Sequence, residues 1–271
     1  MTRTRSNPTL VAVASTAALL LSLMLPAQAI DHDNIDAGRP LSFDDAEAIA
    51  FRERAFETGI TLAAPYRRGG LGARFAAEYL YGLRVNSHYS IDFDPTVGAR
   101  AEGGGRGFDP GNVGLGFFNN FNRETLTKPA YALRADAYLP TGRGAKGVGL
   151  RVRGILSRTF NQYSRFHINA DANVETNPGA GDRAFVPAVT LGFTRPVGYP
   201  TSFNRTMVAE LGARASQERG KGAVLYTGIG LRQQVTVRSV IDVGVQSDFA
   251  GTKSGASRDA LRLTAGYSTQ F

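Results

Sequence analysis

The sequence predicts an all-β protein, a transmembrane antiparallel β-barrel of about twelve strands with a short helical or irregular segment before it. From residue 54 onward, apolar side chains recur at every second position, as in strands with one apolar and one polar face. Short turns alternate with longer Gly-rich polar loops, which is typical of outer-membrane barrels. The chain ends on residues 261–271, a strand of the same pattern whose last residue is aromatic.

The first 29 residues have the features of a signal peptide. Arg3 and Arg5 precede an apolar run at residues 10–25, and Ala27-Gln28-Ala29 provides the small residues of a cleavage site. The run is shorter than the roughly 18 residues that a spanning helix needs. We therefore expect export, with residues 1–29 removed.

Composition excludes several classes of function. The chain contains no cysteine, so it has neither a disulfide framework nor a catalytic thiolate. Its formal net charge is +8, but Lys and Arg are dispersed along the chain, which argues against nucleic acid as a partner. The three histidines, His32, His88 and His167, are too far apart in sequence to indicate a zinc site. We expect no cofactor and no metal.

Residues 30–52 form a polar and acidic segment before the first strand. Ser42 is suited to cap a short helix over residues 43–51, with Asp44 and Asp45 in its first turn; an irregular segment is the alternative. The sequence leaves two locations open. The segment lies in the periplasm, or it enters the lumen as a plug.

Residues 39–46, RPLSFDDA, followed by Glu57 and Gly59 in the next strand, resemble the start of a known family. This is the outer-membrane transporter family named for a meta-pathway of phenol degradation. Its members open with R-P-L, a short spacer and D-D-A, and their first strand contains Glu-x-Gly. The resemblance implies a barrel that takes up aromatic or other hydrophobic compounds.

The barrel itself is expected over residues 53–271. Both termini are expected in the periplasm, with short turns near residues 85–87 and 233–234 on the same side; the 195–204 connection is longer. The expected outer loops cover residues 65–70, 100–111, 140–147, 175–183, 216–222 and 251–258. The expected strands lie at 54–64, 71–83, 88–97, 113–121, 131–139, 148–153, 165–173, 185–193, 207–215, 223–231, 235–249 and 261–271.

One face of these strands is apolar and the other is rich in charge. In an outer-membrane barrel the apolar face contacts lipid and the charged face lines the lumen. Tyr267 and Phe271 mark the closing strand, where the barrel-assembly machinery would recognise the chain. The expected lumen-lining residues are Glu57, Arg74, Glu78, His88, Asp92, Asp94, Arg134, Asp136, Arg151, Arg153, Arg165, His167, Asp171, Glu210, Arg214, Arg232, Arg238, Asp242 and Arg262.

These lumen charges allow two interpretations. In one, they pair across neighbouring strands and partly fill a narrow lumen. In the other, an unpaired excess of arginine on consecutive strands lines a path for acidic or hydrogen-bonding solutes. The arginines of that path would be Arg134, Arg151, Arg153 and Arg165.

An enzyme is not expected. His88 lies near Ser87 and Ser90, as in outer-membrane phospholipases, but His88 has polar-face parity and Ser87 the opposite one. We therefore predict a channel or transporter in the outer membrane of a Gram-negative bacterium, for passive uptake of small aromatic or acidic solutes. Its partners would be outer-membrane lipid, the assembly machinery and the solute. The alternatives are a non-transporting structural or adhesive barrel and, less favoured, a lipase or esterase.

Overall fold

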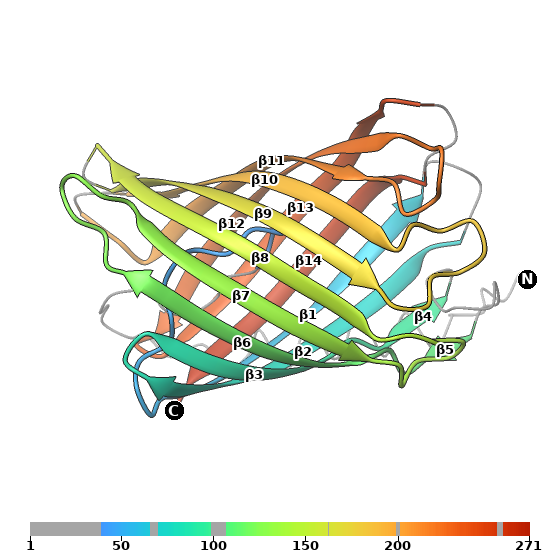
Figure 1. Cartoon of the computed structure of the whole chain (residues 1–271). Helices are drawn as coiled ribbons and strands as arrows, with labels where there is room; N and C mark the ends of the chain where they lie inside the picture. Colours follow the sequence, from blue (N-terminus) through green and yellow to red (C-terminus); the bar gives the residue numbers. More distant parts are fainter. Residues whose placement is uncertain (1–38, 66–69, 99–106, 162, 199–200, 254–256) are drawn as a thin grey trace, which may run out of the picture.

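The structure is a computed structural model that describes residues 39–65, 70–98, 107–161, 163–198, 201–253 and 257–271. These residues form a closed 12-stranded antiparallel barrel (Figure 1). The expected signal peptide, residues 1–29, lies outside the described residues, as do residues 30–38. The strands are β1 (Arg54–Pro65), β2 (Gly72–Arg84), β3 (Ser87–Phe93), β4 (Thr96–Gly98), β5 (Phe108–Asp109), β6 (Val113–Asn122), β7 (Ala130–Leu139), β8 (Gly149–Phe160), β9 (Ser164–Glu175), β10 (Phe185–Pro196), β11 (Arg205–Ala215), β12 (Ala223–Thr236), β13 (Ser239–Gly251) and β14 (Asp259–Gln270).

The barrel closes where β1 pairs with β14. Their register runs from Ala55 opposite Gln270 to Pro65 opposite Asp259, so the first and last strands leave no free edge between them. Every other neighbour in the sheet is also antiparallel. The predicted fold and strand number are confirmed.

The third strand position is divided into two pieces, β3 and β4. Asp94 and Pro95 lie between them, and Pro95 has no N–H to donate to a ladder. The Pro95 carbonyl still accepts a hydrogen bond from Phe75 N at 2.9 Å, which keeps the strand beside β2. β5 pairs with β4 in the same way as β6 pairs with β3, so these four pieces fill two strand positions.

The turn between β12 and β13 differs from the prediction. β12 continues through Gln233 and Gln234 to Thr236, and the turn lies at residues 237–238. No Gly, Pro, Asn or Asp marks this turn, so its residue types do not predict it. Arg238 is an exposed residue of this turn, so its predicted place in the lumen is wrong.

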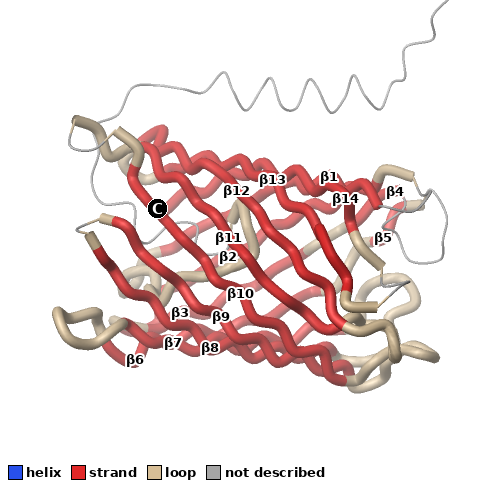
Figure 2. The backbone as a smooth tube through the Cα atoms, turned by 90° about the horizontal axis from the view of Figure 1, so that it is seen from above, coloured by secondary structure: helices blue, strands red, loops and turns tan. Residues whose placement is uncertain are grey.

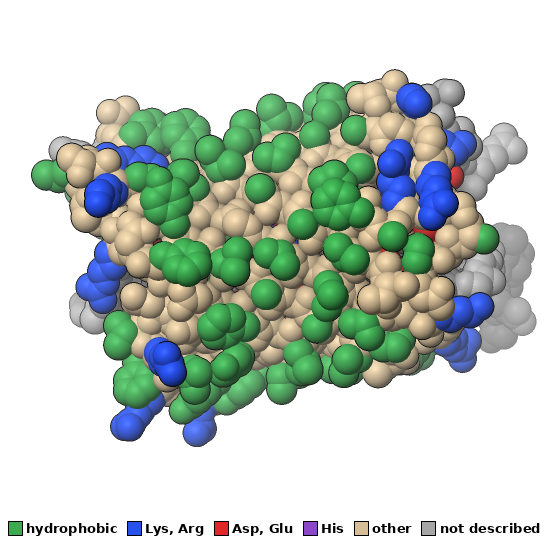
Figure 3. Space-filling view, viewed as in Figure 1, with side chains coloured by type: hydrophobic (Ala, Val, Ile, Leu, Met, Phe, Trp, Pro, Cys, Tyr) green, Lys and Arg blue, Asp and Glu red, His purple; other side chains and the backbone are tan. Residues whose placement is uncertain are grey.

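The outer face of the barrel is apolar through its middle. Figure 3 shows hydrophobic side chains scattered over the strands, with Lys and Arg gathered at the two ends. Alternate residues of the closing strand, Leu261 and Leu263, are about 40% exposed, while Ser268 on the opposite face is fully buried. Exposed apolar side chains in this pattern are suited to contact lipid.

The first strand of the barrel begins, and the last strand finishes, on the same side of the barrel, which carries the C mark in Figure 1. The short β2–β3 and β12–β13 turns lie at the same end as the start of β1 and the end of β14. By the rule that short turns face the periplasm, this is the periplasmic end, and the other is the loop end. Among the described residues, no helix is long and apolar enough to cross a membrane.

Candidate functional site: the lumen and its inner segment

Residues 39–53, here named the inner segment, lie inside the barrel. Figures 1 and 2 show this stretch as an irregular chain enclosed by the strands. It contains no helix, contrary to the helical alternative. Its backbone groups bond to the barrel wall instead, as when Asp44 N donates to Asn169 Oδ1 and Ala46 N to Ser157 Oγ. These bonds replace those that a helix would form.

The inner segment follows the wall around the barrel. Its contacts pass in order from β14 and β12 through β11, β9 and β8 to β6, β3 and β2. It therefore forms a collar between the middle of the barrel and the periplasmic end. The contacts are Arg39 with Ser268 and Arg232, Ser42 with Glu210, Asp44 with Asn169 and Arg153, Ala46 with Ser157 and Asn120, Ile49 with His88, and Arg52 with Gly82.

The first anchor of the collar is the carboxylate of Glu210. Its Oε2 accepts hydrogen bonds from Ser42 N at 2.9 Å and from Ser42 Oγ at 2.6 Å. Its Oε1 accepts from Gln246 Nε2 at 2.6 Å. A buried carboxylate needs such donors, and two of these three come from the inner segment.

The second anchor is Asp44, which is almost fully buried. Its Oδ2 lies 2.8 Å from Arg153 Nη1 and 4.0 Å from Arg134 Nη1. Burial acts to raise the pKa of Asp44, but the arginines outweigh it and lower the pKa to about 2. Arg153 also donates to Asp171 at 2.7 and 3.1 Å, so one guanidinium joins the inner segment to β9. Asp44 is therefore charged at neutral pH when the segment is docked.

Glycines in the wall make room for the apolar residues of the collar. Phe43 stacks on His167, with ring centroids 5.1 Å apart. A Cβ at Gly192 would lie 2.5 Å from atoms of the Phe43 ring, and one at Gly230 would lie 2.5 Å from Pro40. Side chains at these wall positions are therefore incompatible with the observed path of the segment.

The inner segment also completes the hydrophobic contacts inside the barrel. Among the described residues, three clusters of buried apolar side chains occur, and each contains a residue of the inner segment. Leu41 and Phe43 pack on Val208; Ala46 packs against β6, β7 and β8; and Ile49 packs on Ala55 and Leu80.

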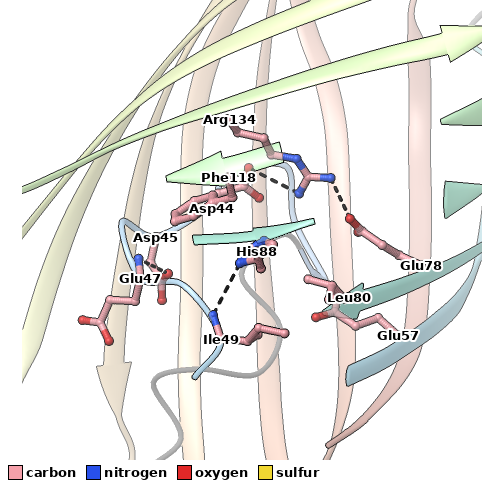
Figure 4. Close-up of a pocket in the computed structure, with 10 residues that line it drawn as sticks. All are labelled: Asp44, Asp45, Glu47, Ile49, Glu57, Glu78, Leu80, His88, Phe118 and Arg134. Atoms are coloured by element: carbon pink, nitrogen blue, oxygen red, sulfur yellow. Dashed lines mark hydrogen bonds and ion pairs between the residues drawn. The ribbon is translucent and has the colours of Figure 1, made fainter. Parts of the chain in front are cut away.

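A small cavity lies between the inner segment and the β1–β7 side of the wall. Figure 4 shows the side chains that surround it. Its volume of about 20 Å³ is room for roughly one water molecule. The lining residues are Asp44, Asp45, Glu47, Ile49, Glu57, Glu78, Leu80, His88, Phe118 and Arg134. Carboxylates outnumber cations among them.

Three carboxylates of the inner segment, Asp44, Asp45 and Glu47, line this cavity in different settings. Glu47 lies 2.7 Å from Arg165 Nη2. Burial, reinforced by the Glu47 charge, raises the pKa of Asp45 to about 7, although Arg165 and Arg232 act in the opposite direction. The two neighbouring aspartates, 44 and 45, therefore respond to pH in opposite ways.

The four arginines of the expected anion path are all paired with carboxylates. Arg134 binds Glu78 and Asp136; Arg151 binds Asp136; Arg153 binds Asp44 and Asp171; Arg165 binds Glu47. The hypothesis of an unpaired excess of arginine on these strands is therefore wrong for this conformation. Cross-strand pairing, the other interpretation, describes the wall better.

The remaining expected residues are distributed as follows. A separate cluster at the loop end joins Arg214 and Arg262 to Asp248, with contacts of 2.7 and 3.1 Å. Arg74 pairs with Asp94 at 2.8 Å at the mouth of the barrel. Buried residues on the inner face are Glu57, His88, Asp136, Arg153, His167, Asp171, Glu210 and Asp242; partly buried ones are Glu78, Asp92, Asp94, Arg134, Arg151, Arg165, Arg214, Arg232 and Arg262; Arg74 and Arg238 are exposed.

Several residues of this network were not among the expected ones. Asn169 and Ser157 hold the collar through hydrogen bonds, and Asp248 holds the loop-end cluster. All three share the inward parity of residues that were expected, so the polar-face pattern could have included them. The wall glycines had no such signal, because their role depends on a segment distant in sequence.

The structure contains one close serine–histidine contact in the lumen. Ser157 Oγ lies 2.9 Å from His167 Nδ1, and both side chains are buried. Thr194 Oγ1, rather than a carboxylate, lies 3.2 Å from His167 Nε2, and Ala46 N already donates to Ser157. The pair lacks the orienting acid and the access that an acyl-transfer site requires. Among the described residues, no group of three or more His, Asp or Glu is placed to hold a metal.

No protein-family model matches this chain, and no curated protein matches its sequence. The resemblance of residues 39–46 to the phenol meta-pathway family therefore stays a prediction. Solved structures do match. The COG4313 outer membrane channel from Pseudomonas putida F1 has a TM-score of 0.66 and 11% identity, over 84% of this chain and 98% of that chain. A structure of the NanC porin has a TM-score of 0.57 and 10% identity, over 78% of this chain and 98% of that chain.

At these identities the structural similarity shows the fold alone. The location in a membrane is indicated by the surface of this chain. A closed barrel with an apolar outer face, polar ends and a charged lumen is the architecture of bacterial outer-membrane proteins. The chain is an outer-membrane β-barrel of a Gram-negative cell, with a collar formed by its own N-terminal segment.

Proposed function

We propose that the barrel is a passive outer-membrane channel for small solutes and that the inner segment sets the width of its lumen. The observation that carries this proposal is the wall itself. Glycines at positions such as 192 and 230 leave space that a separate stretch of chain occupies. A barrel that only needed a filled interior would achieve this with wall side chains alone.

The remaining lumen is polar, which favours diffusion of hydrated solutes. Charges of both signs line it, and each described arginine of the β7–β9 wall has a carboxylate partner. Paired charges offer hydrogen bonds at many points without one deep electrostatic well. Such weak, repeated sites suit conduction, which requires that a solute leaves as readily as it enters.

For the solute, we propose small aromatic compounds. The support is the resemblance of residues 39–46, together with Glu57 and Gly59, to the phenol meta-pathway family. The pairing of the four arginines removes the wall's separate argument for acidic solutes. The transport test should therefore include both acidic and neutral aromatic compounds.

Planar-bilayer conductance of the folded chain tests the channel. We expect discrete channel events, and swelling of liposomes in small aromatic solutes that is faster than in a sugar of similar size. Absence of channel events from a preparation with barrel circular dichroism would contradict transport. Channel events without any preference for aromatic solutes would support the channel but contradict the proposed solute class.

A non-transporting structural or adhesive barrel is the second candidate. One observation favours it: the cavity beside the inner segment has room for roughly one water molecule. In that case the collar and the ion pairs would close the lumen permanently. The same conductance measurement separates the two candidates. A barrel closed by its collar and ion pairs gives no channel events, whereas a channel whose width the collar sets gives events with the collar docked.

A further inference from the structure

The periplasmic end of the barrel carries an excess of basic side chains. Its described carboxylate side chains include Glu47, Glu53 and Glu124, and all three are engaged. Glu47 pairs with Arg165 at 2.7 Å, Glu53 accepts from Ala50 N at 3.3 Å, and Glu124 accepts from Thr159 N at 2.7 Å. We name the basic set the periplasmic rim. It consists of Arg52, Arg54, Arg84, Arg123, Lys128, Arg158, Arg195, Arg205 and Arg238.

Most of the rim charges are exposed and lack an acidic partner. Among the described residues, no carboxylate lies within ion-pair distance of Arg54, Arg195 or Arg238. At the loop end, by contrast, basic and acidic residues are interspersed, as in the Arg74–Asp94 pair. The rim is therefore a one-signed surface on a barrel whose lumen charges are largely paired.

The rim lies directly beyond aromatic side chains on the outer face. Phe160, Phe166 and Phe193 form one cluster there, with ring centroids 4.4 to 6.1 Å apart. Arg195 follows Phe193 by two residues on β10, which runs from the loop end to the periplasmic end. Arg195 thus shares the outward face of its strand with an aromatic ring and lies about 7 Å nearer the periplasm.

Arg54 and Phe56 repeat this spacing at the start of β1. Both are exposed on the outer face, two residues apart, with Arg54 nearer the periplasm. Aromatic girdles lie at the membrane–water interface, so the layer just beyond them contains lipid phosphates. Arginine matches phosphate oxygens with paired N–H donors, which favours this partner over others at that depth.

We propose that the periplasmic rim is a binding surface for the headgroups of anionic phospholipids in the inner leaflet of the outer membrane. The proposal does not depend on transport, since it rests only on the barrel, its orientation and the rim charges. The rim would hold the barrel at a fixed depth, because the aromatic rings and the arginines occupy adjacent layers of the same leaflet.

The test compares two triple variants of the full chain in vesicles. The rim variant carries Arg54→Gln, Arg195→Gln and Arg238→Gln. The matched control carries Arg143→Gln, Lys146→Gln and Lys253→Gln, three exposed residues at the loop end. Each protein is folded into phosphatidylcholine vesicles with and without phosphatidylglycerol, and the urea midpoint of unfolding is followed by circular dichroism.

We expect phosphatidylglycerol to raise the midpoint of the wild type and of the control variant. Most of this rise should be lost in the rim variant, and in the wild type at about 1 M salt, where charges are screened within about 3 Å. An equal rise in the rim variant would overturn the proposal and point to another partner for the rim. Equal losses in both variants would overturn it too, since they indicate a general charge effect. If the rim variant does not fold, the salt dependence of the wild type tests the proposal. A phosphatidylglycerol-induced rise in its urea midpoint that persists at about 1 M salt would contradict headgroup binding.

Discussion

The two halves of the lumen satisfy their charges in different ways. In the loop half, wall residues pair with one another, as Arg214 and Arg262 do with Asp248. In the periplasmic half, wall residues pair with the inner segment, as Arg165 does with Glu47. The loop half is thus complete in the barrel alone, whereas the periplasmic half depends on a stretch of chain that is not part of the sheet.

This difference predicts where the lumen can change. Moving the inner segment would leave Arg153 and Glu210 without half of their partners but would leave the loop-half cluster intact. Each lost hydrogen bond costs about 1 kcal/mol, so the collar is held by many modest contacts. Substitutions can therefore alter one half of the lumen at a time.

The largest effect is expected for Asp44→Ala. Removing one partner of a buried ion pair leaves Arg153 and Arg134 undercompensated, and such losses cost about 3 kcal/mol or more. The inner segment should detach, which is measured as faster proteolysis within residues 39–53 and higher single-channel conductance. The matched control is Asp248→Ala in the loop half, which should weaken the barrel but leave the collar protected. Equal proteolysis in both variants would contradict the assignment.

A smaller effect is expected for Gly192→Val. A Cβ at this position would lie 2.5 Å from the Phe43 ring, and overpacking of this kind costs about 2 kcal/mol. Phe43→Ala in the same chain should restore part of the docking by making space. Gly154→Val is the control, because a Cβ there meets nothing within 4 Å. The collar contact is misassigned if both glycine variants behave alike.

In the loop half, Arg214→Gln should change selectivity rather than width. Arg262 still pairs with Asp248, so the loss of stability should be no more than about 1 kcal/mol for this partly exposed pair. The reversal potential in a salt gradient should shift toward cations, while the proteolysis of residues 39–53 stays unchanged. A change in conductance without a shift in reversal potential would place Arg214 outside the solute path.

An effect of pH is expected through Asp45 in the inner segment. Burial and Glu47 raise its pKa to about 7 in the docked state, above the usual value of 3.8. Docking supported by this group is therefore complete below pH 4 and weakens as the pH rises toward 7. Asp44, with its lowered pKa, acts oppositely and matters only below pH 4. As the pH rises from 4 to 8, the rate of proteolysis within residues 39–53 should increase in the wild type and stay constant in Asp45→Asn. The same dependence on pH in both proteins would argue against this role of Asp45.

Alternation of side chains predicted the wall of the barrel well and its contents poorly. The period of two separates an apolar face from a polar face on each strand. Closure of β1 on β14 follows once every strand has a partner on both sides. The turn at residues 237–238 was missed because Gln233 interrupts the apolar face of β12, so the break in the alternation predicted a turn at residues 233–234, within the strand. Local patterns mark faces more reliably than ends.

The partners of the lumen charges could not be predicted in the same way. Whether Arg153 lies free or binds Asp44 depends on where a segment more than 100 residues earlier in the chain runs. The helix expected after Ser42 failed for the same reason, because Asn169 and Ser157 bind the backbone groups that the helix would have paired. Contacts between a segment and a distant wall leave no periodic trace in the sequence.

The central claim is that the inner segment sets the width of the lumen, and a reversible cross-link tests it most directly. The chain has no native cysteine, and Ala46 N lies 2.9 Å from Ser157 Oγ, so Ala46→Cys with Ser157→Cys should link the segment to β8. This pair is placed in the Asp44→Ala background, and single-channel conductance is recorded before and after reduction. We predict low conductance when oxidised and a rise on reduction. The same conductance in both states would contradict the account.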